Sequence, residues 1–267
     1  MICFDCGGDR LAGSLDEGAA TTGLLIVSGG NEIRSGAYAG QAAMARYFAS
    51  KGFPVFRFDR RGVGDSEGTN GGFESSADDL KAAVTAFRTA APHMQRIIAF
   101  GNCDAATALA CFHAGTGISS LILANPWVTE STDDGPTLPG AATIRSRYWA
   151  RLKNPRSLID LLTGRIDLRK LLAGLAKASA TEAPTQLSAR LAEALSVTEA
   201  RIELLIATQD STAMAFLAAW HSPVFLYVRS RANIRLQDVK TASHSFADPV
   251  SRRWLYDRIE DVLKLPE

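Results

Sequence analysis

The chain has 267 residues, of which 46% are hydrophobic and 21% charged, so it is long enough to bury the core of one α/β domain with an insert. Its formal net charge of +1 argues against a general nucleic-acid-binding protein, which would carry a basic excess. No apolar stretch reaches the roughly 18 residues of a membrane span. The amino terminus also lacks the basic and apolar regions of a secretory signal, so we expect a cytoplasmic protein.

The first half of the chain alternates between strand and helix patterns. Residues 24–27 are a continuous apolar run, which is typical of a strand buried on both faces of a parallel sheet. We predict strands at residues 2–6, 10–14, 23–27 and 53–59, and amphipathic helices at residues 38–50 and 75–90. The pattern continues with strands at 96–100, 120–125, 201–207 and 234–239 and a closing helix at 254–263. Alternating strands and helices predict a mostly parallel sheet covered on both faces.

One segment breaks this alternation. Residues 126–198 carry four helical patterns between two predicted strands, and we interpret them as a helical cap inserted between core segments 1–125 and 199–267. The first half of this cap is basic. A solvated helical face explains such a charge run, and attraction of an anionic substrate to a groove under the cap is the alternative.

A cysteine lies at the apex of a predicted strand, turn and helix. Gly101 and Ala105 stand two residues before and two after Cys103, and small residues there let strand and helix approach closely. This arrangement resembles the nucleophile elbow of α/β-hydrolases, with cysteine in place of serine. The resemblance implies the α/β-hydrolase fold.

The partners of such a nucleophile follow it in the order acid, then histidine. Asp210 comes just after the strand at 201–207, and His244 lies in the loop after the strand at 234–239. Cys103, His244 and Asp210 are therefore the candidate catalytic residues, with His244 exchanging the proton and Asp210 orienting the imidazole. The carboxylate of Asp104, next to the nucleophile, disfavours the thiolate unless it is paired or points into solvent.

An oxyanion hole needs two backbone donors. The amide of Asp104 supplies one, and the glycine-rich turn after residue 27 supplies the second from Gly30 or Asn31. Glu32 and Arg34 follow in the same loop as candidate substrate contacts, and a surface ion pair is the alternative for them. Trp127 is a further candidate for the pocket, although core packing competes with that interpretation.

The sequence indicates no metal ion and no cofactor. Cys3 and Cys6 have CxxC spacing, but no second pair completes a tetrahedral zinc site, and their segment has a strand pattern. We interpret both as structural residues. Cys111, two helical turns after Cys103, fits a packed position.

The resemblance to the α/β-hydrolase superfamily covers essentially the whole chain. The segment 59–66, DRRGVGDS, is similar to the superfamily's DxRGxGxS turn. Within the superfamily, the chain resembles the exosortase A system-associated hydrolase 1 family at three places: residues 29–36 (GGNEIRSG), the cysteine elbow and residues 242–246 (ASHSF). Members of that family accompany exopolysaccharide and protein-sorting gene clusters. Dienelactone hydrolases and polyhydroxyalkanoate synthases also have a cysteine at the elbow.

Three functions remain open from the residues. A cysteine nucleophile suits hydrolysis of a small ester or thioester, and it equally suits acyl transfer, because a thioester acyl-enzyme is susceptible to amines and thiols. A non-catalytic scaffold that binds a ligand under the cap is the third, and the intact set of three candidate residues argues against it. The sequence leaves the acyl donor, the acceptor and the oligomeric state open.

Overall fold

The computed structural model describes residues 1–129 and 185–265 of the chain. Eight strands of these residues form one sheet, in which only β2 runs antiparallel to its neighbours β1 and β4. The order across the sheet is β1 (Ile2–Cys6), β2 (Asp9–Asp16), β4 (Val55–Phe58), β3 (Thr22–Val27), β5 (Arg96–Asn102), β6 (Ile118–Ala124), β7 (Arg201–Ala207) and β8 (Ile234–Val239).

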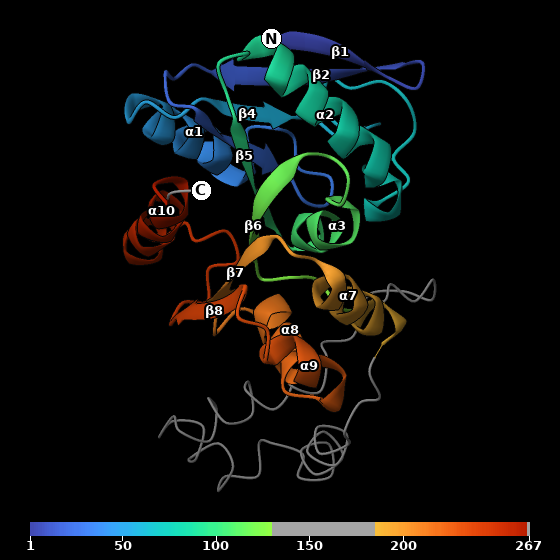
Figure 1. Ribbon diagram of the computed structural model, residues 1–267, viewed down its shortest axis with the longest axis vertical. Helices are drawn as coiled ribbons and strands as arrows, with labels where there is room; N and C mark the ends of the chain where they lie inside the picture. The colour runs from blue at the N-terminus through green and yellow to red at the C-terminus, as the bar shows by residue number, and fades with distance from the viewer. Residues whose placement is uncertain (130–184, 266–267) are drawn as a thin grey trace, which may run out of the picture.

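Helices cover both faces of this sheet (Figure 1). One face carries α1 (Gly40–Ser50) and α10 (Pro249–Leu263), and the other carries α2 (Ser76–Ala90), α3 (Asp104–Phe112) and α7 (Gln186–Val197). The remaining elements are α8 (Ser211–Trp220), α9 (Leu226–Arg229) and the 3-10 turns η1 (Ala37–Ala39), η2 (Phe73–Ser75) and η3 (Pro223–Phe225). None of the helices in the described ranges is long and apolar enough to cross a membrane.

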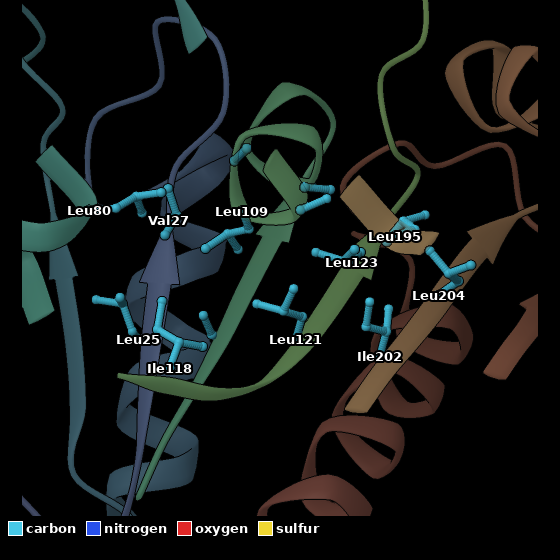
Figure 2. Close-up of a cluster of buried hydrophobic side chains, with 14 of the residues drawn as sticks. Leu25, Val27, Leu80, Leu109, Ile118, Leu121, Leu123, Leu195, Ile202 and Leu204 are labelled. Carbon is cyan, nitrogen blue, oxygen red and sulfur yellow. The ribbon is translucent and has the colours of Figure 1, made fainter. Parts of the chain in front are cut away.

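The central strands alternate their side chains between two cores. Leu25 and Val27 of β3 pack on the α2, α3 and α7 side, whereas Leu24 and Ile26 pack on the α1 and α10 side. All four are fully buried, which explains why this strand is continuously apolar. Figure 2 shows the first core, in which strand residues meet Leu80, Leu109 and Leu195 from the three covering helices.

The register of the parallel strands gathers several chain segments at one edge. Val27 lies opposite Gly101, Asn102 opposite Ala124, and Ala124 opposite Leu205. The loops that follow β3, β5, β6 and β7 therefore start side by side. The chain passes from β3 outward to β4 and then back across β3 to β5, so this edge contains the topological switch point where ligands bind in open α/β sheets.

The predicted α/β-hydrolase fold is confirmed, with differences at individual elements. The helix predicted from residue 38 begins at Gly40, because Tyr38 and Ala39 adopt left-handed conformations with φ of 52° and 56°. No bounds were predicted for the helix α8. Its sequence, STAMAFLAAW, is apolar all round and has no amphipathic period to detect.

Most of the predicted cap, residues 130–184, lies outside the described residues. Its last helical pattern corresponds to α7, which packs against α3 and contributes Leu191, Ala192 and Leu195 to the core. This helix therefore covers the sheet as the core helices do.

Candidate active site

Cys103 occupies a strained turn between β5 and α3. Its φ of 62° and ψ of −127° place the thiol at the apex, and its amide donates to the carbonyl of Ala124 on β6 over 3.0 Å. Gly101 is needed below the apex, because a Cβ there would lie 2.8 Å from the backbone carbon of Ala105. The turn has the strand, apex and helix geometry that the sequence predicts, and the thiol is partly exposed.

Asp210 and His244 lie beside this apex. Nδ1 of His244 is 2.9 Å from Oδ2 of Asp210, and that same oxygen accepts the amide of Ala213 at the start of α8 over 3.0 Å. The carboxylate is thereby fixed at the end of β7, and Asp210 is 6% exposed. The side chain of Cys103 also lies close enough to His244 to raise the pKa of its ring. The three residues predicted from chain order thus come together in one chain of contacts.

The contacts of His244 favour its protonated form. Its hydrogen bond with Asp210 and its interaction with Cys103 raise the pKa of His244 to about 10, against burial, which lowers it. Burial alone would raise the pKa of Asp210, but the hydrogen bonds from His244 and Ala213 hold it below its usual range. Both shifts favour a charged pair of His244 and Asp210 at neutral pH, which places an imidazolium beside Cys103.

Asp104 does not stand uncompensated beside the nucleophile. Its Oδ2 lies 2.9 Å from the guanidinium of Arg60, which is 5% exposed, and its Oδ1 accepts the amide of Gly30 over 2.5 Å. Arg60 also donates to the carbonyl of Gly30 over 2.6 Å and to Ser76 over 3.2 Å. Arg60 and Asp104 therefore hold both polar groups of Gly30, and we call these three residues the Gly30 clamp.

The Gly30 clamp determines which backbone amides near Cys103 remain free to bind an oxyanion. The amide of Gly30 is directed to Asp104, whereas no hydrogen-bond partner is found for the amide of Asn31 within residues 1–129 and 185–265. Asp104 is the first residue of α3, so its own amide has no preceding helical turn to bond. Of the candidate oxyanion donors, Asn31 and Asp104 thus keep free amides.

Two asparagines that the sequence interpretation missed fix the histidine loop. Asn102 and Asn125 each donate their side-chain amide to the carbonyl of His244 over 3.1 Å. Asn125 also donates to Oδ1 of Asn102 over 3.1 Å and accepts the amide of Ala207 over 2.8 Å. It is fully buried, with φ of 42°. One buried amide thus connects the strands that precede Cys103 and Asp210 with the loop of His244.

The other candidate residues differ in their surroundings. The guanidinium of Arg34 is engaged by Asp59 and Asp65 and donates to Ser14, so it is paired within the protein. Trp127 is partly exposed and donates its amide to the carbonyl of Cys103 over 3.2 Å. Glu32 is exposed, and its nearest side-chain hydrogen-bond donor is Gln41, at 3.4 Å.

Two hollows flank the pair of Cys103 and His244. The nucleophile hollow, of about 670 Å³, lies on the α3 and α7 side and is lined by Cys103, Asp104, Trp127, Leu187 and Arg190 among others. The histidine hollow, of about 160 Å³, lies on the α1 and α10 side, and its wall includes Asn102, Ser245 and Phe246. The histidine hollow is therefore lined by Asn102, which precedes Cys103 in the chain, and by Ser245, which follows His244.

The remaining cysteines have structural surroundings. Cys6 is buried and contacts Arg61 and Asp79, and Cys3 is exposed on β1. Burial raises the pKa of the Cys111 thiol, which makes it a weaker nucleophile. In the part of the chain that the structure describes, no group of three or more His, Cys, Asp or Glu side chains could hold a metal ion.

A family comparison agrees with this fold. Residues 19–217 match the Hydrolase_4 family, described as serine aminopeptidase, S33. The chain belongs to this family of α/β-hydrolases. The matched range includes Cys103 and Asp210 and ends before His244. No curated protein sequence matches the chain.

Several solved α/β-hydrolase structures are similar over nearly the whole chain. An esterase of Pyrococcus furiosus, Pf2001, has a TM-score of 0.64 at 16% identity, covering 98% of this chain and 90% of that one. Est1E from Butyrivibrio proteoclasticus, solved with ferulic acid, has 0.63 at 13% identity and covers 98% of both chains. DcsB, solved with a substrate analogue, has 0.64 at 16% identity, covering 98% and 97%. At these identities the similarity supports the fold.

Proposed function

We propose that this α/β-hydrolase cleaves an ester or thioester through a covalent acyl-enzyme on Cys103. The observation that carries the proposal is the chain of contacts from Cys103 through His244 to Asp210 at the switch point of the sheet. The pKa of His244, raised to about 10, favours an imidazolium that stabilises the attacking thiolate.

The proposed reaction has two halves. The thiolate of Cys103 attacks the acyl carbon, and the tetrahedral intermediate collapses as His244 gives its proton to the leaving oxygen or sulfur. Neutral His244 then takes a proton from water, whose oxygen attacks the thioester, and the acid is released as Cys103 leaves as thiolate beside the imidazolium. Asp210 holds the imidazole in one orientation throughout.

The free amides of Asn31 and Asp104 are the proposed oxyanion donors. Gly30 lines the nucleophile hollow, but its amide is directed to Asp104, so we assign it to holding the loop. Trp127 lines the same hollow and is a proposed substrate contact. We assign Arg34 to the loop, because its guanidinium is already paired. Removing one oxyanion donor typically costs about 100- to 1000-fold in kcat.

Acyl transfer to an amine or hydroxyl acceptor is the second candidate function. The histidine hollow lies beside His244, where an acceptor would have to lose its proton, and this placement favours an acceptor other than water. A non-catalytic binding scaffold fits less well, because it gives no reason for the contacts among Cys103, His244 and Asp210.

Other features remain predictions that the sequence supports. The resemblance to exosortase A system-associated hydrolases suggests a cellular context, and a cytoplasmic location stays a prediction. An anionic substrate is predicted from basic residues within segment 145–177, which lies outside the described residues.

Intact-protein mass spectrometry tests the proposed acyl-enzyme. We expect short acyl thioesters and p-nitrophenyl esters to add one acyl mass to the wild type and none to Cys103→Ala. Turnover in Cys103→Ala should fall by about 10⁴-fold or more. Cys111→Ala is the matched control, because it removes a second partly exposed thiol, in the helix that follows Cys103, and should keep the adduct. Turnover near wild type in Cys103→Ala would overturn the mechanism.

The decay of the adduct separates the two candidate reactions. If an added amine or alcohol removes the acyl group faster than water does, transfer is favoured over hydrolysis. Decay that is independent of acceptor concentration would favour hydrolysis.

A further inference from the structure

The histidine hollow has an apolar floor and a charged mouth. Met44 of α1, Phe100 of β5 and Leu255 of α10 are buried side chains that line it, so its floor belongs to the core on that face of the sheet. Glu32 and Arg252 are the charged residues among those that line it, and both are exposed. Such a shape suits a small group with an apolar body and one polar end.

Glu32 differs from the other carboxylates around Cys103. Asp104 is paired with Arg60, and Glu74 of the nucleophile hollow is paired with Arg190. Within the described residues no cation lies within ion-pair distance of Glu32. Its side-chain partner is the neutral amide of Gln41, at 3.4 Å, and the amide of Ala37 also bonds to it.

The electrostatic surroundings of Glu32 connect it to the reacting groups. Desolvation raises the pKa of Glu32, while the Ala37 amide and the charge of His244 oppose that rise. A cation placed in the hollow would give Glu32 an ion-pair partner, which none of the described residues provides, and its pairing with a partly desolvated carboxylate would be favourable.

The reaction places the leaving group on this side of Cys103. His244 must reach the leaving atom to protonate it, and Ser245 and Phe246, which follow His244, line the hollow. The acyl part then faces the nucleophile hollow, which holds Cys103 itself. The two hollows thus correspond to the two halves of an ester or thioester.

We propose that the histidine hollow binds the leaving group of the substrate, and that this group is a small amino alcohol or amino thiol whose cationic end is held by Glu32. The proposal rests on the acyl-enzyme function above. Arg252 also lines the hollow, on α10, and repels a cation from that end, so the amine is confined to the Glu32 end.

A pair of thioesters with the same acyl group and the same leaving-group shape tests the charge preference. Butyrylthiocholine has a cationic leaving group, and S-(3,3-dimethylbutyl) thiobutyrate is its uncharged isostere. We expect kcat/KM of the wild type to favour the cationic probe by about fivefold, the effect of one partly exposed ion pair. The ratio should fall to about one in Glu32→Gln.

Glu67→Gln is the matched control, because it makes the same change at an exposed glutamate that lines neither hollow. It should keep the fivefold ratio. No preference in the wild type, or a preference that survives in Glu32→Gln, would overturn the proposal. A wild-type preference for a carboxylate-bearing thioester that disappears in Arg252→Gln would also overturn the proposal.

A binding measurement separates this proposal from the proposed catalysis. Saturation-transfer NMR with choline and with 3,3-dimethylbutanol needs no turnover. Choline contact in the wild type that is lost in Glu32→Gln supports the amine site even if Cys103 forms no adduct. An adduct on Cys103 without choline contact would leave the catalytic proposal standing and overturn the amine site.

Discussion

The two sides of Cys103 are held in place by different chemistry. On the side of the loop after β3, the buried guanidinium of Arg60 and the carboxylate of Asp104 hold both polar groups of Gly30. On the histidine side, the neutral amides of Asn102 and Asn125 hold the carbonyl of His244. The first arrangement is a charged pair, and the second is a network of uncharged hydrogen bonds.

The difference follows from where charge is already present. Asp104 adjoins the nucleophile, and its carboxylate would disfavour a thiolate there unless a cation compensated it. On the other side the charge is that of His244 itself. Neutral amides that bind its backbone carbonyl fix its position and leave the charge of the ring under the control of Asp210 and Cys103.

Among variants that keep Cys103, the largest expected effect comes from Asp210→Asn. Because the pKa of wild-type His244 is raised to about 10, its ring keeps the proton for the leaving group below pH 10, and kcat/KM should fall as pH rises through that value. Asp210 is the foremost cause of the rise, so its loss should move this alkaline limb to lower pH. We expect kcat/KM for an alkyl thioester to fall by about 10³-fold at pH 8.

The leaving group provides the control for this pH profile. A p-nitrophenyl ester needs no proton on its leaving oxygen, so its alkaline limb should be weaker in the wild type. An alkaline limb at the same pH in Asp210→Asn and the wild type would show that Asp210 does not control the titration of His244.

A smaller effect is expected from the charged side. Arg60→Met leaves Asp104, whose side chain is 16% exposed, without its cation beside Cys103. We expect kcat/KM to fall by about 10²-fold and the free energy of unfolding by about 3 kcal/mol, because one member of a buried pair is left uncompensated. Steady-state kinetics and urea unfolding measure the two quantities.

The double variant Arg60→Met with Asp104→Asn separates charge from shape. It removes both charges and keeps an amide oxygen that can accept the Gly30 amide. The double variant should therefore recover part of the activity lost in Arg60→Met. If it is less active than the single variant, the role of Arg60 is not compensation of Asp104.

The fold was predictable from the sequence because each strand carries its own apolar pattern. The run at residues 24–27 is apolar at every position because both faces of β3 are covered, and that signal is local. The elbow was predictable for the same reason, since Gly101, Cys103 and Ala105 are neighbours in the chain. The start of α1 was not, because nothing local shows that Tyr38 and Ala39 adopt positive φ.

The supports of the site were not predictable, because they depend on contacts between distant segments. Arg60 and Asp104 are 44 residues apart, and Asn125 is 119 residues from His244. In the sequence, Asn125 is a polar residue at the end of a strand, and nothing beside it indicates a carbonyl to bind. Only the strand register, which places Ala124 between Asn102 and Leu205, brings these groups together.

The smallest of these effects is expected from the neutral side. Asn125→Ala removes one of two donors to the His244 carbonyl and frees the amide of Ala207, so the loop of His244 should lose its fixed position. We expect kcat to fall by about tenfold with KM little changed, since small misplacements of a catalytic group slow chemistry more than binding.

Asn233→Ala is the matched control, because Asn233 also donates to two carbonyls, those of Thr198 and Ala200, away from the site. Both variants should lose about 1–3 kcal/mol of unfolding free energy, and only Asn125→Ala should lose kcat. If both variants lose the same stability and both keep the wild-type kcat, the side-chain amide of Asn125 stabilises the fold and does not position His244. The two sides of Cys103 would then differ only in how they stabilise the fold.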